Sequence, residues 1–197
     1  MEQKDWTGNS KATFATLGAS SHSLAERQQQ DYYATDPIAA ELLLQHEKFD
    51  GPIWEPACGE KHLSGVFEQH GYEVRNSDLV QRCECEQLDF LHSNHQPWYG
   101  DIITNPPFRY AQQFVEQSLR VVCDGHKVAM FLRIQFLEGK ERRKLFDITP
   151  PYAVYVFTRR ILCAKNGDFA SYESSAACYA WFLWQKGVNT EPVIRWI

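Results

Sequence analysis

Asn105, Pro106, Pro107 and Phe108 form the segment of this sequence whose residue types are best suited to chemistry. The two prolines fix two φ angles and remove two backbone donors, so the corner is rigid and its free polar groups are acceptors. The side-chain oxygen of Asn105 and the carbonyl of Pro106 could accept both hydrogens of a planar NH₂ group, which favours a pyramidal, nucleophilic nitrogen. Phe108 could stack on the flat group that bears this nitrogen. A surface Asn-Pro turn followed by a core phenylalanine is the structural alternative.

A second candidate site begins at Glu55 and runs through Pro56, Ala57 and Cys58 to Gly59, between an expected strand and an expected helix. A glycine at such a turn lets the backbone approach a ligand closely, and a helix N-terminus offers unpaired N–H groups. Asp78 lies about 20 residues further on, at the end of the next strand, where a Rossmann-like site holds a ribose. Capping of the turn after its own strand is the alternative role for Asp78. The G-x-G-x-x-G pattern is absent, which favours a nucleoside ligand over a dinucleotide.

Short apolar strands that alternate with helical stretches must position these two turns. The apolar patterns predict strands at 53–55, 72–78, 101–104, 127–132, 152–158 and 177–183, and helices over about 37–46, 63–70, 114–122 and 138–146. This alternation predicts an α/β fold with a mostly parallel twisted sheet and helices on both faces. Such sheets bind ligands beyond the carboxyl ends of their strands, where both turns are expected. Residues 1–30 read as a polar N-terminal arm, and 31–197 as a single domain.

The composition is that of a globular protein, with 44% hydrophobic and 14% aromatic residues. The net charge of −5 argues against non-specific attraction to nucleic acid. Basic residues nevertheless gather at 140–144 and 159–165, which is compatible with a polyanionic substrate; a solvated helix face is the alternative for the first of these clusters. The polar N-terminus is unlike a secretory signal and no apolar run could span a bilayer, so we expect a cytoplasmic protein that does not bind membranes.

The six cysteines do not show the spacing of a metal site. Only Cys83 and Cys85 are close in the sequence, and no second Cys or His pair follows at zinc-ligand spacing. We therefore expect free thiols and no bound metal.

Together these motifs resemble those of class I S-adenosylmethionine-dependent methyltransferases. The Asn-Pro-Pro-Phe form resembles the amino-methylating branch, above all the adenine-specific DNA methyltransferases, and the chain is similar to small, prophage-type members without a large target-recognition domain. The resemblance implies a Rossmann-like fold, S-adenosylmethionine as cofactor, and methylation of the exocyclic 6-amino group of adenine in DNA.

The resemblance also implies a role for each matching residue. Glu55 to Gly59 would line the methionine end of the cofactor, Asp78 would hold its ribose, and Asp89 would hold its adenine amino group. Phe90 would lie beside the adenine ring, and Tyr33, Thr35 and Pro37 match an upstream segment that packs against the methionine part. Asn105 and Pro106 would hold the target nitrogen, with Pro107 locking the turn and Phe108 stacking on the target. Lys61 departs from the family pattern, which has a second glycine at this position.

Two other functions fit the same residues. A methyltransferase for a protein glutamine side chain or an RNA base would use the same acceptor pair, and the acidic net charge favours it. A nucleic-acid-binding module without turnover would explain Lys61. The segment from Asn166 through Gly167 and Asp168 to Phe169, together with Tyr172, could form a pocket rim or a plain loop.

Overall fold

The computed structural model describes residues 33–165, 167, 169–171, 175 and 177–197. The predicted N-terminal arm, 1–30, lies outside the described residues, as do Asn166, Asp168 and Tyr172 of the predicted pocket rim. No helix in the described part of the chain has the length and apolar character that a bilayer crossing demands.

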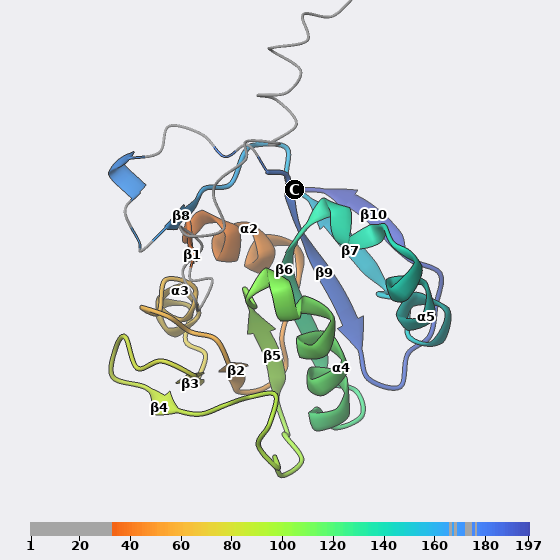
Figure 1. The fold of residues 1–197 in the computed structure, drawn as a ribbon, viewed down its shortest axis with the longest axis horizontal. Helices are drawn as coiled ribbons and strands as arrows, with labels where there is room; N and C mark the ends of the chain where they lie inside the picture. The colour runs from red at the N-terminus through yellow and green to blue at the C-terminus, as the bar shows by residue number, and fades with distance from the viewer. Residues whose placement is uncertain (1–32, 166, 168, 172–174, 176) are drawn as a thin grey trace, which may run out of the picture.

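Ten strands and four α-helices make up the described fold (Figure 1). The α-helices are α2 (Ile38–His46), α3 (Ser64–Gln69), α4 (Ala111–Val121) and α5 (Lys140–Ile148), and the 3₁₀ turns are η2 (Phe108–Tyr110), η3 (Ile134–Leu137) and η4 (Phe169–Ser171). The strands are β1 (Tyr33–Thr35), β2 (Ile53–Glu55), β3 (Val74–Asp78), β4 (Glu86–Gln87), β5 (Asp101–Thr104), β6 (Lys127–Arg133), β7 (Ala153–Val156), β8 (Cys163–Lys165), β9 (Tyr179–Gln185) and β10 (Val193–Trp196).

Eight of these strands form one sheet in the order β10-β7-β9-β6-β5-β2-β3-β4. All neighbouring strands are parallel except β9, which runs antiparallel to both β6 and β7. The predicted mostly parallel sheet is therefore confirmed. The strand order reverses at β2: β3 and β4 follow on one side, and the chain then returns to place β5 on the other. The carboxyl ends of β2 and β5 therefore flank a point where ligands bind in such sheets.

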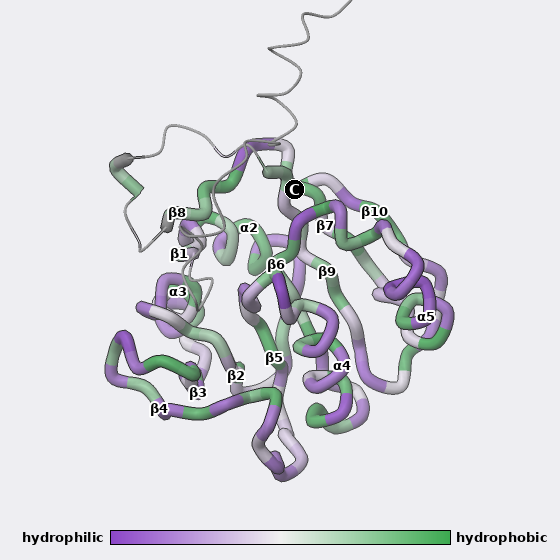
Figure 2. The backbone as a smooth tube through the Cα atoms, in the orientation of Figure 1, coloured by the Kyte–Doolittle hydropathy of each residue, from purple (hydrophilic) through white to green (hydrophobic). Residues whose placement is uncertain are grey.

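Helices cover both faces of the sheet, as the sequence pattern predicts. Helices α2 and α3 pack on one face, and α4 and α5 on the other. The strand side chains alternate between these two cores: on β5, Ile103 faces the first and Ile102 the second. Figure 2 shows hydrophobic stretches along the central strands, whereas hydrophilic residues prevail on the outer turns of α5.

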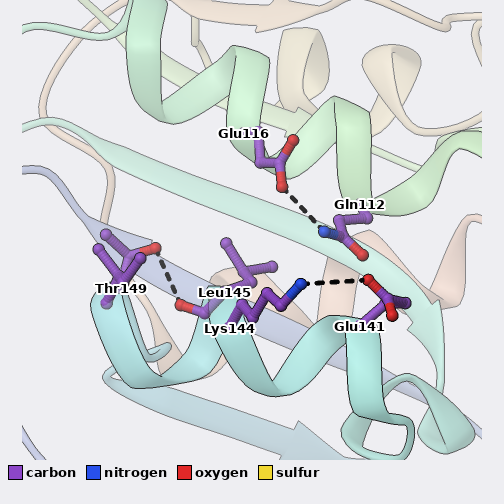
Figure 3. A pocket seen from close by; sticks show the side chains of 7 residues that line it. Gln112, Glu116, Glu141, Lys144, Leu145 and Thr149 are labelled. Carbon is purple, nitrogen blue, oxygen red and sulfur yellow. Dashed lines mark hydrogen bonds and ion pairs between the residues drawn. The ribbon is translucent and has the colours of Figure 1, made fainter.

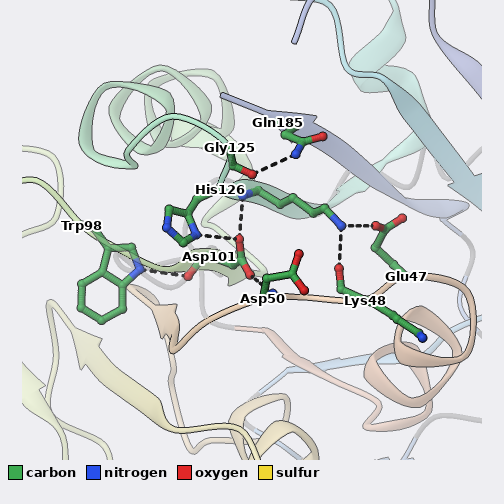
Figure 4. Close-up of polar contacts among 9 residues, drawn as sticks. Glu47, Lys48, Asp50, Trp98, Asp101, Gly125, His126 and Gln185 are labelled. Atoms are coloured by element: carbon green, nitrogen blue, oxygen red, sulfur yellow. Dashed lines mark hydrogen bonds and ion pairs between the residues drawn. The ribbon is translucent and has the colours of Figure 1, made fainter. Parts of the chain in front are cut away.

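A buried polar cluster ties the amino-terminal end of β5 to its surroundings (Figure 4). The Asp101 carboxylate is 1% exposed and accepts hydrogen bonds from the backbone N–H groups of Asp50 (3.0 Å) and Lys127 (2.7 Å). Burial raises the pKa of Asp101, and these hydrogen bonds oppose the rise. The Lys127 ammonium pairs with Glu47 at 2.6 Å. This cluster lies at the end of the strand opposite Asn105, so it supports the fold and not the candidate site.

A separate two-stranded antiparallel sheet joins β1 to β8, with Ala34 opposite Ala164. Neither strand is predicted from the sequence, because each has three residues and their pairing spans most of the chain. This small sheet brings Tyr33 and Thr35 to the carboxyl end of β5.

Candidate active site

Asn105 follows β5 directly, and its side-chain amide is held by β1. Its Nδ2 atom donates to the backbone oxygen of Tyr33 at 3.1 Å and to Oγ1 of Thr35 at 2.7 Å. A backbone carbonyl can only accept, so the first of these bonds fixes which end of the amide is nitrogen. Both N–H groups are therefore committed to β1.

The Asn105 side-chain oxygen has no hydrogen-bond partner among the described residues, although it is buried. A buried acceptor without a partner costs about 1–3 kcal/mol, so such atoms are rare unless a ligand completes them. The hydroxyl of Thr104, the preceding residue, is also buried and unpartnered. The corner thus holds a buried acceptor whose orientation is fixed by β1 and which has no partner among the described residues.

The two prolines shape the corner in the predicted way. Pro106 is buried, and Pro107 has φ −54° and ψ 121°. The Tyr110 N–H donates to the Pro107 carbonyl at 2.8 Å, which starts the 3₁₀ turn η2. The role of the Pro106 carbonyl as second acceptor stays a prediction.

Phe108 lies in an aromatic stack that closes one side of the corner. Its ring stacks on Tyr33 with centroids 6.3 Å apart and on Tyr179 with centroids 5.7 Å apart. The guanidinium of Arg133 lies 4.8 Å from the Phe108 ring centroid. Phe108 is half-buried and packs against the core. This contact agrees with the alternative expectation of a core phenylalanine, and stacking on a target stays a prediction.

Tyr179 and Arg133 also contact Phe108 at this corner, although the sequence did not point to either of them. Arg133 ends β6, the strand next to β5, and is exposed; Tyr179 begins β9 directly opposite it. Burial is the main cause that raises the pKa of the Tyr179 phenol, so it stays a neutral hydroxyl at physiological pH. The sequence could have indicated Arg133, because it stands at the carboxyl end of the strand expected next after the one that precedes the Asn-Pro-Pro-Phe corner.

The turn from Glu55 to Gly59 is bonded to the end of the neighbouring strand β3. Gly59 has φ 54°, and its N–H donates to Oδ2 of Asp78 at 2.8 Å. The other oxygen of Asp78 accepts from Val80 N–H at 2.9 Å and pairs with Arg82 at 3.3 Å. Asp78 thus caps its own turn, as the structural alternative predicts, and also holds the glycine of the second turn. A carboxylate has about four lone-pair directions, so a hydroxyl could still donate to Oδ2.

Glu55 is buried at the base of this turn and is 2% exposed. Desolvation by burial raises its pKa to about 8, although hydrogen bonds from Ser64 oppose this rise. The Ser64 hydroxyl contacts both Glu55 Oε2 and Asn76 Oδ1, and the Asn76 amide nitrogen is turned toward Glu68. One hydroxyl hydrogen cannot serve two acceptors, so a protonated Glu55 completes this chain of hydrogen bonds.

Glu55→Gln should change how stability depends on pH. Because the folded-state pKa is raised from 4.5 to about 8, the native protein keeps a proton that the unfolded chain loses. The stability from this proton is fully present below pH 4.5 and is lost as pH rises through about 8, a difference of roughly 4–5 kcal/mol. Urea denaturation from pH 5 to 9 should show the Gln variant falling less steeply than wild type. Equal slopes would contradict the buried acid, and Glu73→Gln at an exposed position is the control.

Lys61 occupies the position where the resembled family has glycine. Its backbone conformation shows why glycine would suit this position. Among described residues other than glycine, Lys61 alone has a positive φ, 64°. A side chain in this left-handed region costs roughly 1–2 kcal/mol, so the turn keeps the geometry that glycine would adopt freely.

Lys61→Gly should therefore stabilise the fold by about 1 kcal/mol, because the strain at φ 64° is removed. Chemical denaturation would measure the change. Lys48→Gly, at an exposed position without positive φ, should instead destabilise or leave the protein unchanged. Loss of stability in Lys61→Gly would show that contacts of the Lys61 side chain outweigh the strain.

The remaining predicted cofactor residues are more dispersed. Asp89 caps the turn after it by accepting from the N–H groups of Leu91 (3.0 Å) and His92 (3.2 Å). Phe90 is 2% exposed and packs edge-on against Trp54, so it belongs to the core. Pro37 is exposed at the start of α2, Pro56 is buried and Ala57 is half-buried. Their contacts with a cofactor stay predictions.

The basic cluster on α5 forms contacts within its own region. Arg143 pairs with Asp147 at 2.6 Å, and Lys144 with Glu141 at 3.7 Å. Arg142 donates to the backbone oxygens of Gln135 and Glu138. These bonds favour the solvated-face interpretation for 140–144. In the predicted pocket-rim segment, the Phe169 ring lies 5.4 Å from His62, beside the Glu55–Gly59 turn.

Two hollows flank α4, and neither contains a predicted site residue. The first, about 300 Å³, lies between α4 and α5 (Figure 3). Its polar groups pair with one another, as Gln112 with Glu116 at 2.9 Å. The second, about 500 Å³, is lined by Leu91, His92, Tyr110, Gln113, Glu116, Gln117 and Arg120. The candidate site is therefore defined by the corner at Asn105 and the turn at Gly59, and not by either hollow.

Comparison with solved structures identifies the fold. No protein-family model matches the sequence, and no curated protein matches it either. A protein of Agrobacterium tumefaciens described as a predicted O-methyltransferase superposes with a TM-score of 0.59 at 13% identity, over 82% of this chain and 85% of that one. A Listeria monocytogenes protein described as a candidate class I S-adenosylmethionine-dependent methyltransferase gives 0.56 at 16% identity, over 95% and 71%.

A third similar structure matches over nearly the whole of this chain. It is a modification subunit of a type I restriction enzyme from Vibrio vulnificus, with a TM-score of 0.56 at 12% identity over 94% of this chain and 51% of that one. This chain therefore spans about half of that subunit. Together these structures show that the protein has the Rossmann-like fold of class I methyltransferases.

Proposed function

We propose that this protein is an S-adenosylmethionine-dependent methyltransferase whose target is the exocyclic 6-amino group of adenine in DNA. The observation that carries the proposal is the buried Asn105 side-chain oxygen, which lacks a partner while the nitrogen of the same amide is held by Tyr33 and Thr35. The position of Asn105 directly after β5 supports the proposal, because sheets of this kind bind ligands beyond the carboxyl ends of their strands.

The residues of the second turn fit the proposed cofactor. Glu55 to Gly59 would hold its methionine end, Asp78 its ribose through the open direction on Oδ2, and Asp89 its adenine. Tyr33, Thr35 and Pro37 would border the methionine part from the other side. S-adenosylmethionine, when bound, supplies an electrophilic methyl group on a sulfonium centre.

The corner at Asn105 would position the target nitrogen. Its Oδ1 accepts one hydrogen of the NH₂ group, and the Pro106 carbonyl accepts the other, so the nitrogen lone pair turns toward the methyl group. The chain supplies orientation and not a covalent intermediate; correct placement of two reactants can account for about 7–11 kcal/mol of a barrier. Adenine in a duplex must first leave the base stack, at a cost of a few kcal/mol.

Arg133 is a better candidate for contact with a polyanionic substrate than the basic residues of α5 are. It is exposed at the end of β6 and contacts the uncharged side chains of Phe108 and Tyr179, whereas Arg143 and Lys144 of α5 pair with carboxylates of their own helix. A phosphate contact there would give binding that weakens as salt rises. Among the similar structures, the type I restriction modification subunit and a Pyrococcus horikoshii protein described as a candidate RNA methyltransferase point to nucleic acids as a substrate class.

The test is incubation of the full chain with methyl-labelled S-adenosylmethionine and, separately, unmethylated DNA, RNA and cell protein. We expect label in DNA, recovered as N6-methyladenine after digestion to nucleosides. Label confined to RNA or to protein glutamine would replace adenine in DNA by one of the alternative substrates. If none of the three substrates is labelled and calorimetry detects no binding of the cofactor, the proposed methyltransferase activity is wrong.

A further inference from the structure

Three cysteines that are far apart in the sequence meet beside the Glu55–Gly59 turn. Cys58 belongs to that turn, after β2, and Cys83 and Cys85 belong to the loop between β3 and β4. Because β2 and β3 are parallel neighbours, their carboxyl-end loops lie side by side. The Cys58 N–H also donates to the Ser77 carbonyl at 3.0 Å, which holds the turn against β3.

The three sulfur atoms all lie within 4.8 Å of one another. Sulfurs around a tetrahedral zinc ion, with bonds of about 2.3 Å, are about 3.8 Å apart. The three thiols therefore need to approach by about 1 Å or less to share one ion. None of the six cysteines is in a disulfide, so all three sulfurs are available as ligands.

One cation lies close enough to offset part of the charge of a metal–thiolate group. Three thiolates and a divalent ion carry a net charge of −1, and Lys61 interacts electrostatically with Cys83. Lys61 is held in its strained backbone conformation at this turn, with φ 64°. The lysine that replaces the family's glycine thus places a cation next to the sulfurs. Cys58 is buried, whereas Cys83 and Cys85 are half-buried, so an ion could enter from the loop side.

We propose that Cys58, Cys83 and Cys85 bind a thiophilic divalent ion of the zinc type through three thiolates, with water in the fourth position. Each thiol releases its proton to solvent as its sulfur–metal bond forms, and no electron is transferred. The ion would tie the loop between β3 and β4 to the Glu55–Gly59 turn. This proposal does not depend on the methyltransferase activity.

Cobalt is the probe, because its thiolate complexes absorb in the near ultraviolet. The full chain, reduced and freed of metal with a chelator, is titrated with Co²⁺ under a non-thiol reductant. We expect a sulfur-to-cobalt charge-transfer band that saturates at a single ion per chain and disappears when Zn²⁺ is added. Zn²⁺ should also raise the thermal midpoint, since a ligand that binds the native state stabilises it.

Cys83→Ser and Cys85→Ser should each weaken Co²⁺ binding by about tenfold or more and reduce the band. Cys123→Ser, a half-buried cysteine on another loop, is the matched control and should bind like wild type. Circular dichroism of the metal-free variants establishes that they remain folded. A band that survives both loop substitutions, or no saturable uptake by the folded reduced protein, overturns the site. A disulfide between two of these sulfurs in protein purified without reductant, with no metal uptake after reduction, also overturns it.

Discussion

Replacing Asn105 by alanine is expected to reduce methyl transfer by about 10²–10³-fold, while S-adenosylmethionine binds almost as well as before. The effect follows from the amide geometry: β1 holds the nitrogen, and the buried oxygen has only an incoming donor to bind. The bond to the target strengthens as the nitrogen becomes pyramidal, so its loss falls on kcat more than on cofactor affinity. Single-turnover kinetics with labelled cofactor, and calorimetry for binding, measure the two quantities separately.

Two further variants make this result specific. Asn94→Ala removes an exposed asparagine elsewhere and should leave turnover unchanged. Thr35→Val removes one acceptor for the Asn105 amide and should give an intermediate loss, since the oxygen is then less firmly oriented. Turnover in Asn105→Ala within about twofold of wild type would exclude the corner from the mechanism.

Asp78→Ala is expected to weaken S-adenosylmethionine binding by about 10–100-fold. The substitution leaves the N–H groups of Gly59 and Val80 without their acceptor, and each unsatisfied buried donor costs about 1–3 kcal/mol. Both turns at the proposed cofactor site would then loosen. Isothermal calorimetry of the full chain measures the affinity, and chemical denaturation measures the accompanying loss of stability.

Asp78→Asn separates the two roles of this side chain. An amide keeps one acceptor for a backbone N–H but loses the second, so it preserves part of the turn while weakening a ribose contact. Asp124→Ala, at an exposed position away from both turns, is the control and should bind normally. Unchanged affinity in Asp78→Ala would show that Asp78 only caps its own turn.

The helices and strands that could be predicted are those that neighbouring residues in the sequence determine. The strand before Asn105 and the strand before Pro56 are short runs that are buried on both faces, with proline one or two residues after their ends, and both appear where expected. The helix at Pro37 and the break at Gly71, which has φ 85°, follow from backbone preferences of single residues. The strand β10 was missed because its four residues are too few to show a period, and only its pairing with β7 defines it as a strand.

What could not be predicted depends on contacts between distant parts of the chain. The partners of the Asn105 amide come from β1, and the stacking of Tyr179 on Phe108 comes from a strand more than seventy residues further on. The grouping of Cys58 with Cys83 and Cys85 matches no metal-ligand spacing in the sequence, because parallel neighbouring strands bring the loops together. Spacing rules describe ligands on one hairpin or helix and cannot detect such a cluster.

The pairing of β1 with β8 has a practical consequence for any shortened form of this protein. A version that begins after Thr35 would keep every strand of the eight-stranded sheet, and it could fold with a normal spectrum. It would nevertheless lack both atoms that hold the Asn105 nitrogen, leaving that amide free to rotate and to present either end to a substrate. Removal of β1 together with the residues that precede it would thus separate folding from the proposed activity.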